Sequence, residues 1–117
     1  ETPPVVMLFS QIGKTIVKNF YEMGDIEREK IFKHVEDGMV SIDDELATVV
    51  ATGLIEAIVT ATDSNSLLWK DVSKFLGDKS KSHALVWKDF GQERYSLRSI
   101  KFAIEALILL EVKLKLG

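Results

Sequence analysis

Carboxylates are the side chains of this sequence whose types and spacing could support chemistry. Six of them cluster in the first half of the chain: Glu36, Asp37, Asp43, Asp44, Glu45 and Glu56. Paired carboxylates perform acid–base catalysis only when they are buried and their pKa values are driven apart, whereas adjacent carboxylates at a helix junction are usually solvated. We therefore predict that the six form an acidic patch that attracts a basic protein and repels nucleic acid. The alternative is that these acids only stabilise helix starts and keep the protein in solution.

The charge distribution along the chain favours such a patch. The net charge is −3, but residues 25–63 carry ten acidic against three basic side chains, giving −7, and residues 64–117 carry ten basic against six acidic ones, giving +4. Within the acidic half, four polar residues recur at helical spacing and predict one outward-facing stripe: Glu45, Thr52, Glu56 and Asp63. The basic half intersperses its charges with acids and matches no nucleic-acid-binding motif, so we expect no nucleic-acid partner.

Other reactive constellations are missing from the sequence. There is no cysteine, neither His34 nor His83 follows a glutamate by three residues, and the seven glycines stand singly rather than in a phosphate-binding loop. We therefore predict no metal, no cofactor and no enzymatic activity. Trp69 and Trp87 are interpreted as packing residues, with a ligand cleft or a nucleic-acid stacking platform as the alternative.

Hydrophobic residues at spacings of three and four predict the helices that would position these side chains. The expected ranges are residues 3–23, 25–38, 42–62, 67–76, 80–90 and a last helix from residue 96, with a strand at residues 112–116 as an alternative ending. The third range is apolar around most of its circumference and should lie at the centre. Gly53 in its middle predicts a close helix crossing.

Local signals define the expected helix ends. Gly24 is predicted to end the first helix in a left-handed conformation, and Asp25 to cap the second. Ser41 with Asp44 resembles a capping box for the third helix. One face of the first helix is expected to enter the core through Val5, Leu8, Phe9, Ile12, Ile16 and Phe20.

These elements predict an all-α fold, a compact bundle of about six helices or stacked helical hairpins, in a single domain of residues 1–117. The most apolar stretch, residues 100–116, contains five charged residues and is not a membrane span. The lack of cysteine is typical of a cytoplasmic protein. We expect a monomer or a weak dimer.

Three segments carry a resemblance to a known group of proteins. They are D-I-E-R-E-K-I-F-K-H-V-E-D-G (residues 25–38), D-D-E-L-A-T-V-V-A-T-G-L-I-E-A-I (residues 43–58) and L-W-K-D-V-S-K-F-L-G-D-K-S (residues 68–80). Together they resemble small all-helical bacterial immunity proteins, which are encoded beside secreted toxins. The resemblance implies that the protein binds a cognate toxin domain one to one and neutralises it. A toxin with a basic cleft would be complementary in charge to the acidic patch. The alternative is a helical scaffold or adaptor protein.

Overall fold

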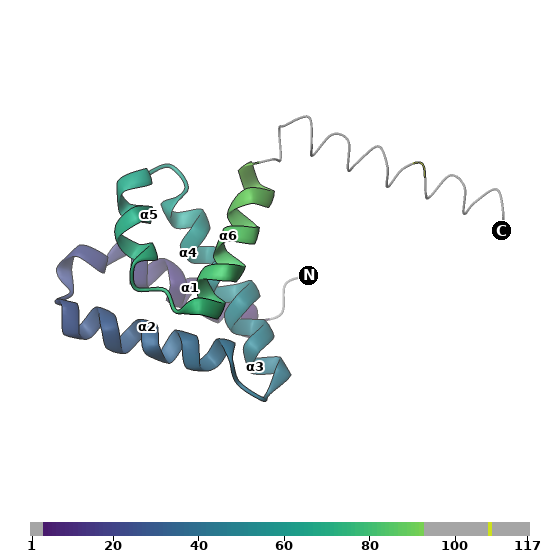
Figure 1. The fold of residues 1–117 in the computed structure, drawn as a ribbon. Coiled ribbons are helices and arrows are strands. Elements are labelled where there is room, and N and C mark those ends of the chain that lie inside the picture. The colour runs from purple at the N-terminus through teal and green to yellow at the C-terminus, as the bar shows by residue number, and fades with distance from the viewer. Residues whose placement is uncertain (1–3, 93–107, 109–117) are drawn as a thin grey trace, which may run out of the picture. The chain divides into compact units, whose positions relative to one another are not determined.

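The computed structural model describes residues 4–92 and residue 108, and its regular structure in these residues is entirely helical. In chain order the elements are α1 (Pro4–Lys18), the 3-10 helix η1 (Phe20–Glu22), α2 (Asp25–Met39), α3 (Asp44–Val49), the π-helix η2 (Val50–Ile55), α4 (Glu56–Thr62), α5 (Ser66–Ser73) and α6 (Asp78–Gln92) (Figure 1). The predicted all-α class is confirmed for the described residues.

The helix count is confirmed only in part. Elements α3, η2 and α4 form one continuous helix, Asp44–Thr62, which we call the central helix, so the described residues contain five helices. The helix predicted from Ser96 and the alternative strand at residues 112–116 lie outside the described residues. The chain divides into two compact units, residues 1–87 and 88–117, and the single domain stays a prediction. All side-chain contacts discussed below lie in the first unit.

Helix α1 crosses the central helix at very short range, through glycines on both sides. A Cβ atom on Gly13 would lie 2.5 Å from the carbonyl oxygen of Leu54, and one on Gly53 would lie 2.9 Å from the Cβ atom of Phe9. At the same crossing, Ser10 Oγ donates a hydrogen bond to the Gly53 carbonyl oxygen at 3.2 Å. The close crossing predicted at Gly53 is confirmed, and it explains why the central helix tolerates a residue with low helix propensity.

Replacing Gly13 with alanine should therefore destabilise the fold. The methyl group would meet a backbone carbonyl that cannot move without shifting a helix, so we expect the free energy of unfolding to fall by about 2 kcal/mol, despite alanine's better helix propensity. Gly24→Ala is the matched control, because its Cβ would approach only Glu27 Oε1, at 3.8 Å. Urea denaturation of both variants measures the difference. Equal stabilities would contradict the tight crossing.

An aromatic cluster connects α2 and the α5–α6 region to the end of α1. The ring centroids of Phe20, Phe32 and Phe75 lie 5.7 to 6.3 Å apart. The Arg28 guanidinium carbon lies 4.2 Å from the Phe20 ring centroid, and Arg28 Nε donates a hydrogen bond to the Phe20 carbonyl oxygen. The Arg28 guanidinium therefore forms a cation–π contact with Phe20, which adds electrostatic attraction to the packing of the cluster.

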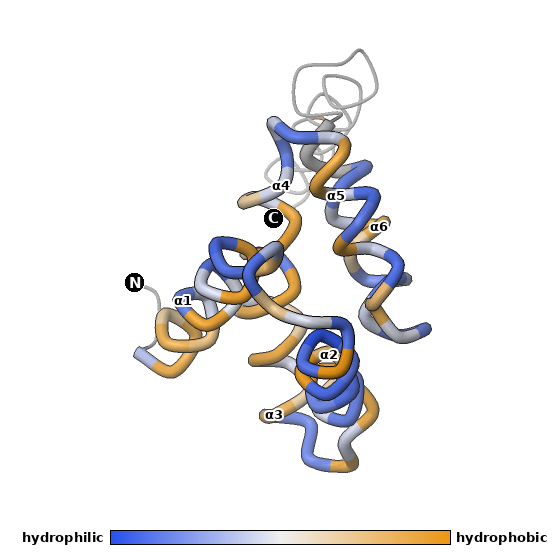
Figure 2. Tube along the Cα trace, turned by 90° about the vertical axis from the view of Figure 1, so that its left-hand side faces the viewer, coloured by the Kyte–Doolittle hydropathy of each residue, from blue (hydrophilic) through white to orange (hydrophobic). Residues whose placement is uncertain are grey.

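The remaining core surrounds the central helix. The buried apolar side chains that belong to this helix are Val50, Leu54, Ile55, Ala57, Ile58 and Val59, and the Thr62 side chain is also buried. Helix α2 supplies far fewer apolar residues and is coloured mainly blue in Figure 2, consistent with one buried stripe on an otherwise polar helix. Trp69 and Trp87 are half-buried and pack against the same core, which confirms their interpretation as packing residues.

The predicted core face of α1 is only partly correct. Ile16 and Phe20 are buried as expected, but Val5, Leu8 and Ile12 are 47%, 58% and 38% exposed. The helix instead buries a neighbouring face, because Gly13 and Val17 allow and support the close crossing with the central helix. Part of the predicted core stripe is consequently left facing outward.

Two predicted helix ends are also corrected. Gly24 does not adopt a left-handed conformation, since its φ is −77°, and it is the N-cap of α2, so that Asp25 becomes the first helical residue. The capping residue of α3 is Asp43, whose Oδ1 accepts hydrogen bonds from the backbone N–H groups of Glu45 and Leu46. Ser41 Oγ accepts one from the backbone N–H of Asp43, so it supports the cap rather than forming it.

The central helix is long and apolar enough to cross a membrane when judged by length and composition alone. Core helices of globular domains share this property, and here α1 packs directly across the helix at η2 and α4.

The π-helical segment η2 interrupts the α-helical spacing between Glu45 and Glu56. Glu45, Thr52 and Asp63 of the predicted polar stripe are nevertheless exposed and Glu56 is partly exposed, and the alignment of the four along one face stays a prediction.

Candidate protein-binding surface

Glu36 is half-buried and bonded to α6 rather than displayed on a patch. Its Oε1 accepts hydrogen bonds from the backbone N–H of Ser80 at 2.9 Å and from Ser80 Oγ at 2.7 Å, and its Oε2 accepts one from the backbone N–H of Lys79 at 2.9 Å. These donors belong to the first turn of α6, whose N–H groups have no partner within the helix. A carboxylate from α2 thus caps α6 across 43 residues of sequence.

The surroundings of Glu36 favour its ionised form. Partial burial raises the pKa of this carboxyl group. The hydrogen bonds from the Ser80 hydroxyl and from the two backbone N–H groups, together with the charge of Lys79, lower the pKa by more than burial raises it. The net result is a pKa below the ordinary glutamate value. Gly77 makes the approach possible, since a Cβ atom there would lie 2.5 Å from Glu36 Cδ.

Two more of the predicted patch residues have partners within the fold. Glu56 Oε2 lies 2.9 Å from His83 Nε2, and the two side chains are only 20% and 31% exposed. Asp37 Oδ2 lies 3.2 Å from Lys33 Nζ in a largely exposed pair one helical turn apart. Exposed pairs of this kind contribute little stability and exchange readily with water. Asp37 therefore stays accessible, whereas Glu56 is largely enclosed.

The start of α3 gathers the remaining acids. Asp43 caps the helix, and Asp44 and Glu45 lie exposed in its first turn. Within the described residues, the side chains of Asp44 and Glu45 have no hydrogen bond or ion pair. We call Asp43, Asp44 and Glu45 the acidic corner. The structure thus brings three of the six predicted residues together and leaves Glu36 and Glu56 committed to α6.

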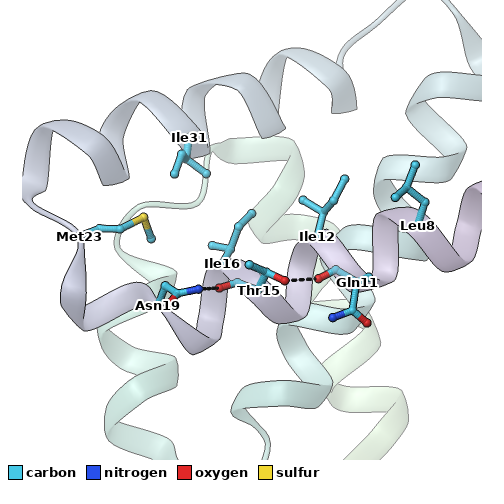
Figure 3. Close-up of a pocket in the computed structure, with 8 residues that line it drawn as sticks. All are labelled: Leu8, Gln11, Ile12, Thr15, Ile16, Asn19, Met23 and Ile31. Atoms are coloured by element: carbon cyan, nitrogen blue, oxygen red, sulfur yellow. Dashed lines mark hydrogen bonds between the residues drawn. The ribbon is translucent and has the colours of Figure 1, made fainter.

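An apolar groove lies beside the acidic corner and was not predicted from the sequence. One hollow of about 270 Å³ runs between α1 and α2 and is lined by Leu8, Gln11, Ile12, Thr15, Ile16, Asn19, Met23 and Ile31 (Figure 3). A second, of about 450 Å³, adjoins it and is lined by Phe9, Ile12, Ile16, Ile31, His34, Val35, Asp37, Gly38, Leu46, Val50 and Leu54. The two share three isoleucines, and we treat them as one apolar groove.

Two polar side chains in this groove, Thr15 and Asn19, donate hydrogen bonds to the backbone of α1. Figure 3 shows Ile31 of α2 pointing toward α1, with Ile12 and Ile16 opposite. Thr15 Oγ1 donates to the Gln11 carbonyl oxygen at 2.8 Å, and Asn19 Nδ2 donates to the Thr15 carbonyl oxygen at 2.9 Å. The polar groups on this wall are thus partly satisfied without a ligand, which leaves hydrophobic contact as the main interaction the groove offers.

Comparisons with protein-family models, with curated proteins and with solved structures give no match. The resemblance to immunity proteins therefore stays a prediction, and the surface itself has to carry the functional argument.

The groove and the acidic corner are contiguous. Leu46 lines the groove, and its backbone N–H is bonded to the capping carboxylate of Asp43. Asp37, on α2, lines the same hollow. Val40 and Ile42, in the turn that precedes Asp43, are 55% and 102% exposed, so exposed apolar side chains also adjoin the corner in the chain. An apolar surface with acids at its margin is the composition of many protein interfaces, which have a hydrophobic centre and a polar rim.

The described residues offer few side chains for metal binding or for histidine chemistry. Within residues 4–92, no three histidine, cysteine, aspartate or glutamate side chains are grouped closely enough to hold a metal ion. His34 is exposed on the groove wall, and His83 is half-buried and paired with Glu56. Sequence reasoning missed the groove although its signal was present: the apolar positions of α1 are too many for one buried face.

Proposed function

We propose that this protein acts by binding another protein, and that it neutralises a cognate bacterial toxin in the manner of an immunity protein. The observation that supports this proposal is the contiguity of the apolar groove with the acidic corner through Leu46 and Asp43. Neither feature alone would distinguish an interface from ordinary surface. Together they provide apolar area for affinity and a charged margin for orientation.

The two features have separate roles in the proposed complex. Asp44 and Glu45 remain solvated in the free protein, so their charge can attract a basic partner before contact. The groove then contributes the hydrophobic burial that slows dissociation, since removal of apolar surface from water is favourable by roughly 25 cal/mol per Å², of which only the part left after the entropy cost of association stabilises the complex. A toxin whose active site binds nucleic acid would present a basic surface of the required sign. Occupying that surface would neutralise the toxin without any chemical step.

Coexpression with the product of the neighbouring toxin gene tests the proposal. We expect cells to survive induction of the toxin only when this protein is present, and the two chains to elute together as a one-to-one complex in size-exclusion chromatography with light scattering. Cells that die in the presence of a folded, abundant protein would contradict neutralisation. A stable complex that leaves the toxin active would instead assign the chain to the scaffold or adaptor class.

A further inference from the structure

We infer that the apolar groove receives one amphipathic α-helix of the partner, whose apolar stripe fills the groove and whose basic side chains lie over the acidic corner. This inference rests on the proposed function and specifies which structural element of the partner is bound. It is carried by the groove side chains that residues 4–92 leave exposed, by the backbone chemistry of the groove walls and by the sign of the charges along its margin.

The first observation is apolar surface that the described residues leave uncovered. Leu8 is 58% exposed, and Ile12 and Leu46 are each 38% exposed, although all three line the groove. Ile16 and Val35 lie buried at its base. Single exposed hydrophobic residues are normal, but a continuous row along one groove indicates a binding surface.

The second observation concerns backbone hydrogen bonds. The groove walls are helices α1, α2 and α3 with η2, whose backbone groups are already bonded within each helix. Such walls offer no row of free N–H and C=O groups to an extended peptide, which would lose its hydrogen bonds to water on entering. A helix satisfies its own backbone groups and presents apolar side chains at spacings of three and four. The walls therefore select a helical partner over a strand.

The length of the groove fits a helix of three to four turns. The lining residues on the α1 wall begin at Leu8, and the 11 steps from Leu8 to Asn19 correspond to roughly 17 Å at about 1.5 Å per residue. Asn19 lies just beyond the end of α1. An occupant with apolar residues at i, i+4, i+7 and i+11 would place them along this distance.

The third observation is the sign of the charges. Among the described residues that line the groove, Asp37 carries the single formal charge, and Lys33 pairs with this carboxylate without lining the groove itself. Within residues 4–92, the acidic corner supplies the unpaired negative charge of the margin, at the Leu46 end. Lys14 and Lys18 are exposed on α1 but do not line the groove. A partner helix with lysine or arginine toward α3 is therefore favoured over an acidic one.

A model peptide tests the groove without knowledge of the toxin. The probe is a 16-residue helix of leucine and lysine with one leucine stripe, and the controls are the same helix with glutamate for lysine and a proline-interrupted version. In methyl-labelled full-length protein, the first peptide should shift the NMR signals of Leu8, Ile12 and Ile31. We expect the glutamate helix to bind at least about tenfold more weakly. Equal binding of the two helices, or shifts outside the groove, would overturn the inference.

The toxin complex supplies the second arm. Ile12→Asn, in the groove, should weaken both peptide and toxin binding at least about tenfold. Ile26→Asn is the matched control, because Ile26 is 71% exposed on α2 and does not line the groove. Circular dichroism would verify that both variants are folded. Full toxin affinity in the Ile12 variant would show that the groove is not the binding site, while leaving the proposed function intact. The absence of any toxin complex with the wild-type protein would refute the proposed function.

A photo-crosslinker identifies the occupant directly. Benzoylphenylalanine in place of Leu8 should crosslink to toxin residues that recur every three or four positions, as one face of a helix requires. The same group in place of Ile26 should not. Crosslinks to a second copy of this chain, to residues 93–117 of the same chain or to toxin residues without helical spacing would each overturn the inference.

Discussion

Replacing both Asp44 and Glu45 with lysine is expected to weaken the complex with a basic partner by at least about tenfold. Both side chains are exposed and have no partner within the described residues, so the free protein loses little when they change. We expect the free energy of unfolding to fall by less than about 2 kcal/mol, because lysines at a helix start oppose its dipole.

Surface plasmon resonance at two salt concentrations would separate the two contributions to this loss. Wild-type association should slow as salt rises, whereas association of the variant should be slower and less sensitive to salt. The control is Glu22→Lys with Asp63→Lys, which changes the net charge equally at two exposed acids outside the acidic corner. If the control weakens binding as much as the test variant does, net charge rather than the acidic corner attracts the partner.

Replacing Glu36 with glutamine is expected to lower the free energy of unfolding by about 2 kcal/mol at pH 7, the largest stability effect of any single acidic residue described here. The carboxylate accepts three hydrogen bonds from Lys79 and Ser80. Glutamine has only one acceptor oxygen, and its NH2 group would face backbone donors of α6. The helix start would lose both a hydrogen bond and a favourable charge.

The same substitution predicts a defined pH dependence. The folded state lowers the pKa of Glu36 below its ordinary value of 4.5, so the ionised group stabilises the fold fully above that value and loses this contribution as the pH falls through the folded pKa. Glutamine does not titrate. The stability difference between wild type and variant should therefore be largest at neutral pH and shrink on acidification.

Urea denaturation at pH 7 and pH 3 measures this difference. Asp37→Asn is the control, because the neighbouring carboxylate forms an exposed pair with Lys33 and should change stability by less than about 0.5 kcal/mol at either pH. If Glu36→Gln lowers the free energy of unfolding equally at both pH values, the shape of the side chain rather than its charge stabilises the start of α6. An equal effect at Asp37 would mean that the position on α2, and not the contact with α6, is responsible.

Local sequence signals predicted most of the helical framework. The range 25–38 became Asp25–Met39, and the range 42–62 became Asp44–Thr62, because apolar spacing and end signals act within a few residues of each other. Gly53 also revealed the crossing with α1, since an otherwise unfavourable glycine needs a packing reason. These features depend on local propensity and on a single neighbour.

The site was less predictable because its residues depend on contacts distant in sequence. Nothing near Glu36 indicates that its carboxylate bonds to Lys79 and Ser80, and nothing near Glu56 indicates His83. Charge counting therefore placed both on a patch. For α1, periodicity identified the apolar residues but could not decide which of two overlapping faces would be buried, because Gly13 and its contact with Leu54 made that choice.

The π-helical segment η2 explains how one helix serves both the core and the groove. A π turn contains more residues than an α turn, so the residues after Ile55 have a different angular phase from that of an unbroken α-helix. Before η2, Leu46 contributes to the groove and Asp44 remains in water; after it, Ile58 and Val59 enter the interior. The wider turn therefore rotates the side chains that follow η2 about the helix axis relative to those that precede it, so that the first part of the central helix faces the groove and the last part faces the core.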